Sequence, residues 1–176
     1  EASESEIVDL CSEMVRIPTV SPPGESRELA RLIESYFNDL GIGARIYEKV
    51  EKKSSVCAEV PGGKSGKILW LIHIDTMPPG DPSFWRHDPY GGEVVGGKVY
   101  GRGSSDTKGA GAAAMVAAKV LKGIPKKDRC SAEFWFTTCE EIGGDEGAKW
   151  LAEEGRFRGD VCVVGDSEGF LPKEPV

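Results

Sequence analysis

The feature that most constrains the fold is the alternation of short apolar runs with amphipathic helical stretches. Apolar residues recur with helical spacing over residues 4–16, 25–40, 107–122 and 145–154, which predicts helices there. Strand-like runs cover 44–50, 54–60, 67–72, 131–138 and 161–165, and a further short strand is expected near 93–100. Strands that alternate with helices predict an α/β sheet domain. The run 67–72 is nearly all apolar, so we expect that strand to be buried on both faces.

The sequence predicts a single domain that contains a long loop. Its 176 residues suit one core, and no repeat or linker divides them, so we treat residues 1–176 as part of one domain. The stretch Ser21-Pro22-Pro23-Gly24 predicts a turn. Residues 77–98 hold many of the Pro, Gly and aromatic residues of the chain, which indicates a long loop of the kind that often serves function.

Composition excludes several functions. The net charge of -7 argues against nucleic acid, which requires a basic surface. No apolar run reaches the length of a membrane span, and residues 1–17 lack the basic and apolar regions of a signal peptide, so we expect a cytoplasmic protein without a membrane partner. Five cysteines without C-x-x-C spacing suggest buried, reduced thiols rather than a disulfide framework.

Ligand-type side chains follow the predicted strands. In open α/β sheets, ligands gather beyond the carboxyl ends of the strands. His73 and Asp75 follow one apolar run, Glu140 and Glu141 follow a second, and Asp166 follows a third. Another acid, Asp106, comes just before an Ala-rich helix. One imidazole with several carboxylates suits zinc, manganese or cobalt, and a bridging carboxylate could hold two ions.

Each side chain also suits a specific part in such a site. A metal-bound imidazole usually donates its second N–H to an oxygen that fixes the tautomer, and Asp75 is the candidate for that part. Of the adjacent Glu140 and Glu141, one can face the metal while the other holds a water as general base. Taken alone, each motif has a plainer explanation: Asp106 could cap the next helix, Asp166 could be a turn acid, and adjacent glutamates usually begin a solvated helix.

Together, the motifs resemble the two-zinc family of aminoacylases, acetylornithine deacetylases, succinyl-diaminopimelate desuccinylases and glutamate carboxypeptidases. The resemblance lies in ordered blocks: LIHIDT (71–76), FWRHDPY (84–90), GKVYGRGSSDTKG (97–109), TCEEIGG (138–144) and VVGD (163–166). It implies a three-layer αβα catalytic domain around a central mixed sheet, incomplete in this chain. The implied reaction is hydrolysis of amide bonds in N-acyl amino acids or short peptides by a metal-activated water.

The resemblance also implies a role for each site residue. His73, Asp106 and Asp166 would hold one zinc ion, and Asp106 would bridge to a second zinc ion that Glu141 also binds. Glu140 would be the catalytic base and Asp75 the partner of His73. The ligand of the fourth block could also be Glu168, two residues after Asp166. The resemblance further implies a cis peptide bond after Asp106.

The chain departs from the family in its length. Family members are much longer: they add a smaller dimerisation domain, through which the full-length protein would form a homodimer, and then a further part of the catalytic domain with another histidine ligand. The other histidine here, His87, is expected to have a surface role. We therefore hypothesise that this chain alone binds one metal ion better than the second and has little activity.

Three other functions are less consistent with the sequence. A non-catalytic metal-binding module would use the same ligands without turnover. Nucleotide binding fails on spacing, because Asp106 stands where a dinucleotide fingerprint requires glycine, and Ala58 stands where a phosphate-binding loop requires its first glycine. A cysteine hydrolase built on Cys139 would need an activating histidine beside the thiol.

Overall fold

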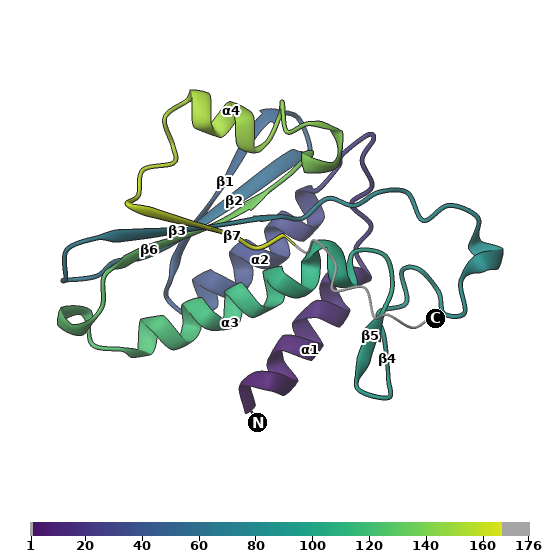
Figure 1. Cartoon of the computed structure of the whole chain (residues 1–176), viewed down its shortest axis with the longest axis horizontal. Helices are drawn as coiled ribbons and strands as arrows, with labels where there is room; N and C mark the ends of the chain where they lie inside the picture. The colour runs from purple at the N-terminus through teal and green to yellow at the C-terminus, as the bar shows by residue number, and fades with distance from the viewer. Residues whose placement is uncertain (1, 167–176) are drawn as a thin grey trace.

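A mixed sheet forms the centre of the molecule. The computed structural model describes residues 2–166, in which five strands pair in the order β1-β2-β6-β3-β7 (Figure 1). The pairs β1–β2 and β2–β6 are antiparallel, whereas β6–β3 and β3–β7 are parallel. The carboxyl ends of β3, β6 and β7 therefore meet at the same edge. The strands span β1 Gly43–Val50, β2 Lys53–Val60, β3 Lys67–His73, β6 Ser131–Thr137 and β7 Val161–Val164.

Helices cover both faces of the sheet. Three of them, α1 (Ala2–Val15), α2 (Arg27–Asp39) and α3 (Gly109–Gly123), lie on one face, and the short α4 (Ala148–Glu153) lies on the other (Figure 1). Shorter helical turns lie between these elements: η1 (Pro82–Phe84), η2 (Ser104–Lys108), η3 (Lys126–Asp128) and η4 (Glu140–Ile142). The arrangement confirms the predicted three-layer αβα fold around a mixed sheet.

The larger core lies between the sheet and α1, α2 and α3. Apolar residues at helical spacing turn one face of α2 inward, and Phe37 packs on Phe136 of β6 with ring centroids 5.8 Å apart. Full burial of such side chains stabilises the fold by roughly 1.5–3 kcal/mol each. Helix α3 is rich in small residues, which lets α1 approach closely: a Cβ at Gly111 would lie 3.1 Å from the Met14 methyl.

The smaller core lies under α4. Trp135 of β6 contacts Tyr47 and Phe157, with centroid distances of 5.2 and 5.1 Å, and Leu151 of α4 is fully buried beside them. One charged residue is also buried at this face. Glu133 forms an ion pair with Lys67 and accepts a hydrogen bond of 2.9 Å from the Trp135 indole.

Two predictions of local structure were wrong. The single strand expected near 93–100 is a hairpin of β4 (Glu93–Val95) and β5 (Lys98–Tyr100), because Gly96-Gly97 forms a two-residue turn. Strand β3 is not buried on both faces: Ile68 and Trp70 are only partly buried and line an apolar groove beside α3. The strand with buried side chains on both faces is β6.

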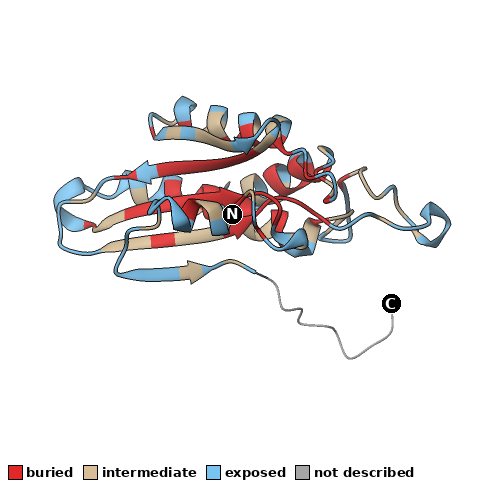
Figure 2. Ribbon diagram, turned by 90° about the horizontal axis from the view of Figure 1, so that it is seen from above, coloured by how far each residue is buried: buried red, intermediate tan, exposed pale blue. Residues whose placement is uncertain are grey.

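Strand β7 forms one edge of the sheet. It pairs only with β3 among the described strands, and most of it is exposed (Figure 2). Val161 and Val164 are 57% and 62% exposed. The groove beside α3, with a volume of about 440 Å³, lies on the face between β3, β6 and α3. Apolar surface is thus left open near this edge of the sheet.

Among residues 2–166, no helix combines the length and the apolar character needed to cross a membrane. Three of the five cysteines, Cys11, Cys57 and Cys139, are buried as predicted, whereas Cys162 is exposed on β7.

Candidate metal centre

Four chain segments bring the predicted site residues to one edge of the sheet. His73 is the last residue of β3, Glu140 and Glu141 begin the turn η4 after β6, and Asp166 comes two residues after β7. Asp106 belongs to η2, the turn directly before α3. The parallel direction of β3, β6 and β7 explains why residues distant in sequence meet here.

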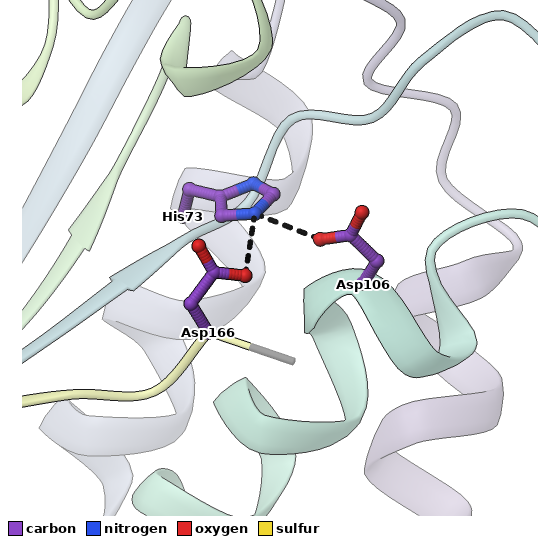
Figure 3. A group of neighbouring side chains, drawn as sticks. All are labelled: His73, Asp106 and Asp166. Carbon is purple, nitrogen blue, oxygen red and sulfur yellow. Dashed lines mark hydrogen bonds and ion pairs between the residues drawn. The ribbon is translucent and has the colours of Figure 1, made fainter. Parts of the chain in front are cut away.

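His73, Asp106 and Asp166 form a compact group. The Nε2 atom of His73 lies 3.0 Å from Asp106 Oδ1 and 3.9 Å from Asp166 Oδ1 (Figure 3). One nitrogen or oxygen atom from each residue lies within 4.8 Å of the others. The imidazole is buried, whereas the carboxylates are 53% and 44% exposed, so the group opens to solvent. The alternative ligand Glu168 lies outside the described residues.

In the turn that carries Asp106, the backbone packs closely against neighbouring side chains. Gly103 precedes it with φ +87, and a Cβ there would lie 2.6 Å from Thr76 Cγ2. The peptide bond between Asp106 and Thr107 is cis, as the resemblance implies. The Thr107 hydroxyl donates a hydrogen bond of 2.6 Å to the His73 carbonyl oxygen, which joins this turn to the end of β3.

Asp75 lies on the opposite side of the imidazole from the other two acids. Its backbone carbonyl oxygen is 3.1 Å from His73 Nδ1, while its carboxylate Oδ1 is 3.7 Å from the same nitrogen. The carbonyl oxygen, rather than the carboxylate, is therefore the closer partner of the ring. Either oxygen can hold the tautomer that leaves Nε2 free to bind a metal.

The charges around His73 favour a cation at this position. Burial opposes protonation of the imidazole, but the hydrogen bond to Asp75 and the charges of Asp75, Asp106 and Glu140 outweigh burial. Together they raise the pKa of His73 to about 9.

The two adjacent glutamates differ in their surroundings. Glu140 is exposed and lines a cleft of about 220 Å³ with His73 and Asp166. Glu141 is partly buried, and its carboxylate accepts a hydrogen bond of 3.1 Å from the Met77 backbone N–H. Burial first, and then the charge of Asp106, raises the pKa of Glu141. The compact group thus contains three of the four predicted ligands, and Glu141 stands beside it.

Two residues outside the predicted ligand set, His87 and Cys139, lie in surroundings that do not suit a ligand of this site or a reactive nucleophile. His87 is outside the group: its ring pairs with Glu93 at 2.8 Å and packs on Tyr100 at 4.1 Å. Cys139 is fully buried, burial raises the pKa of its thiol, and its hydrogen-bond partner is the Thr138 hydroxyl. An activated cysteine requires the opposite surroundings, namely exposure and a neighbouring base.

Sequence reasoning missed two buried polar residues that support this edge. Ser21 donates a hydrogen bond of 2.6 Å to Asp75, and the fully buried Lys108 donates one of 2.8 Å to the Ile17 carbonyl oxygen. Lys108 stands two residues after Asp106 in the sequence, which could have marked it as a residue of the site. That spacing does not show that its side chain is buried. Ser21 belongs to a predicted turn with no pattern that links it to β3.

The donor set fits a transition metal or zinc. An imidazole nitrogen and two carboxylate oxygens within reach of one another are ligands that zinc, cobalt and manganese accept. The open side of the group also leaves room for water or substrate, as catalytic zinc sites require.

Comparisons with known proteins point to one family. Residues 69–173 match peptidase family M20/M25/M40. A succinyl-diaminopimelate desuccinylase from Methylocella silvestris is 32% identical over 166 residues, which cover 90% of this chain and 42% of that protein. The chain therefore spans less than half the length of this curated relative.

Solved structures share the fold. A metallo-carboxypeptidase of this family from Sulfolobus solfataricus superposes with a TM-score of 0.77 at 24% identity, covering 92% of this chain and 37% of that one. Human carnosine dipeptidase 1 gives a TM-score of 0.74 at 26% identity, covering 94% of this chain and 39% of that one.

Proposed function

Because the chain belongs to peptidase family M20/M25/M40, we propose that it is the metal-binding part of a hydrolase that cleaves amide bonds in N-acyl amino acids or short peptides. The desuccinylase and dipeptidase names of similar proteins support these two substrate classes. The observation that carries the proposal is the group formed by His73 at the end of β3, Asp166 just after the parallel strand β7, and Asp106 in the turn η2.

The residues present suit two metal ions unequally. His73, Asp106 and Asp166 would hold one zinc ion, while Asp106 and Glu141 would hold a second. Cobalt or manganese could substitute for zinc, because all three accept these donors. When bound, such ions supply Lewis acidity, which activates water and polarises a substrate carbonyl at neutral pH.

The chain's own side chains would move the proton and hold the ligands. Glu140 is exposed at the cleft beside His73, so its carboxylate can accept a proton from the attacking water. The same carboxyl group would then deliver that proton to the leaving nitrogen. Asp75, buried behind the imidazole, would hold His73 in one orientation.

We further propose that the complete enzyme contains parts that this chain lacks. The open edge of β7 and the apolar groove beside α3 suit contact with the remainder of a catalytic domain. A separate, smaller domain would join two subunits in a homodimer. The chain covers 42% of the similar desuccinylase, which supports the proposal that the complete enzyme is longer.

The proposal is tested by zinc titration of the chain and two variants. His73→Ala removes the nitrogen ligand, so zinc affinity should fall by more than about 100-fold, because even indirect contacts to a ligand cost 10–100-fold. His87→Ala removes the other histidine, which stands outside the group, and should bind zinc as the parent does. Equal affinity of the parent and His73→Ala would contradict the proposal.

A further inference from the structure

A short segment between α1 and α2 runs beside the end of β3. We call residues 17–21 the strap. Ser21 donates its backbone N–H to the Thr76 carbonyl oxygen at 2.9 Å, and Thr76 donates its own N–H to the Thr19 carbonyl oxygen at 2.9 Å. The Thr19 hydroxyl donates to the Ile74 carbonyl oxygen at 2.6 Å. The strap is thus fixed to the chain on both sides of Asp75.

One strap side chain reaches the Asp75 carboxylate. The Ser21 hydroxyl donates to Oδ2 at 2.6 Å, and both residues are fully buried. Two further donors come from the turn η4: the Glu140 N–H donates to Oδ1 at 3.0 Å, and the Glu141 N–H donates to Oδ2 at 3.3 Å. Asp75 therefore joins the strap, the end of β3 and the turn that carries both glutamates.

The three hydrogen bonds are unequal. A buried carboxylate is costly unless donors satisfy its oxygens, and short O–H···O⁻ bonds are among the strongest that proteins make. The Ser21 hydroxyl makes the shortest of the three bonds and the only one from a side chain. Without it, Oδ2 would keep only the 3.3 Å bond from Glu141, and the carboxylate plane could turn away from His73 and the Glu140 N–H.

We propose that Ser21 is a positioning residue for the metal centre and acts through Asp75. Its hydroxyl fixes the plane of the Asp75 carboxylate, which holds the backbone N–H groups of Glu140 and Glu141 and places its negative charge 3.7 Å from His73 Nδ1. Metal affinity therefore depends on a residue of the N-terminal strap that touches none of the predicted ligands. This inference rests on the proposed function in one respect, because it assumes that His73 binds a metal.

A matched pair of variants separates positioning from simple stability. Ser21→Ala removes the hydroxyl that reaches Asp75. Thr19→Val removes a buried strap hydroxyl that reaches only the Ile74 carbonyl oxygen. Calorimetric titration with zinc should show affinity about tenfold weaker for Ser21→Ala, at the low end of effects from residues behind a ligand, and almost unchanged for Thr19→Val. Equal losses in the two variants would overturn the proposal.

The loss of zinc affinity caused by Ser21→Ala should also become much smaller when residue 75 is no longer a carboxylate. In an Asp75→Asn background, Ser21→Ala should change zinc affinity much less than it does in the parent chain, because contacting residues couple in a double-mutant cycle. An undiminished tenfold loss in that background would show that Ser21 acts by another route.

A measurement without metal keeps the inference separate from the proposed function. In the metal-free chain, Ser21→Ala should shift the NMR signals of the Glu140 and Glu141 backbone amides and speed their hydrogen exchange, whereas Thr19→Val should leave them nearly unchanged. Unchanged amide signals in Ser21→Ala would refute the positioning role. Failure of the parent chain to bind zinc would refute the proposed function alone.

Should Ser21→Ala not fold, Ser21→Cys provides the same comparison. Its thiol is a weaker donor than the hydroxyl and is somewhat larger, so the bond to Asp75 should weaken, and the amide shifts and the loss of zinc affinity should remain measurable. Behaviour identical to the parent in both measurements would contradict the proposal.

Discussion

Replacing Gly103 with alanine should destabilise the turn that carries Asp106. Gly103 has φ +87, a left-handed conformation that costs an alanine about 1–2 kcal/mol. The added methyl would also lie 2.6 Å from Thr76 Cγ2, 3.2 Å from Lys108 Cδ and 3.4 Å from Lys108 Cε. Thr76 and Lys108 are both fully buried, so neither can move aside without disturbing its neighbours.

The expected cost is the sum of these two effects. Overpacking of a filled site costs typically about 1–3 kcal/mol, which brings the expected loss in unfolding free energy to about 3 kcal/mol. Relief of the contact would displace the turn η2, so zinc affinity should fall as well, because Asp106 lies in that turn.

Gly96 is a matched control for the conformational cost of placing alanine at a positive φ. It has φ +58, but nothing lies within 4 Å of the position its Cβ would take, so Gly96→Ala should cost only about 1 kcal/mol and leave zinc affinity unchanged. Urea denaturation of both variants measures the difference. Equal losses of unfolding free energy for Gly103→Ala and Gly96→Ala would refute the packing argument at this turn.

Two further predictions concern pH and metal stoichiometry. The hydrogen bond from Arg27, with its charge, lowers the pKa of Glu48 from 4.5 to about 2, so their pairing stabilises the fold above pH 4.5 and is lost as the pH falls through about 2. Arg27→Met should therefore lower the urea midpoint at pH 7 and much less at pH 2, whereas Arg31→Met on the same helix should change neither; a loss independent of pH would contradict this account. In zinc titrations, the chain should show one tighter site and a much weaker second one, with little hydrolysis of N-acyl amino acids, because the second ion would have only Asp106 and Glu141. Two equal sites, or full turnover with one equivalent of zinc, would refute this account.

Much of the sheet could be predicted from the sequence, because strand and helix periodicities reflect burial directly. The apolar run before His73 and the run before Glu140 both form parallel strands, and their carboxyl ends meet where the candidate ligands lie. The identity of the most buried strand could not be predicted. Strand β6 is paired on both sides and covered on both faces, whereas the side chains of Ile68 and Trp70 in β3 border an open groove.

The missed features of the site are long-range contacts between polar side chains. Spacing placed Asp75 beside His73, but it could not show that the Asp75 carbonyl oxygen is nearer to Nδ1 than the carboxylate is. Nor could it show that the Ser21 hydroxyl, 54 residues away in sequence, supports that carboxylate. Such contacts depend on tertiary packing and leave no periodic signal in the chain. The individual metal ligands and the cytoplasmic location remain predictions.

The central claim is that His73, Asp106 and Asp166 bind a metal ion together. Anomalous diffraction at the zinc absorption edge, from crystals of the chain grown with zinc, locates bound ions directly. We predict a peak about 2.0–2.2 Å from His73 Nε2 and from a carboxylate oxygen of each acid. Zinc bound elsewhere, for instance between His87 and Glu93, with no peak at this group, would contradict the account.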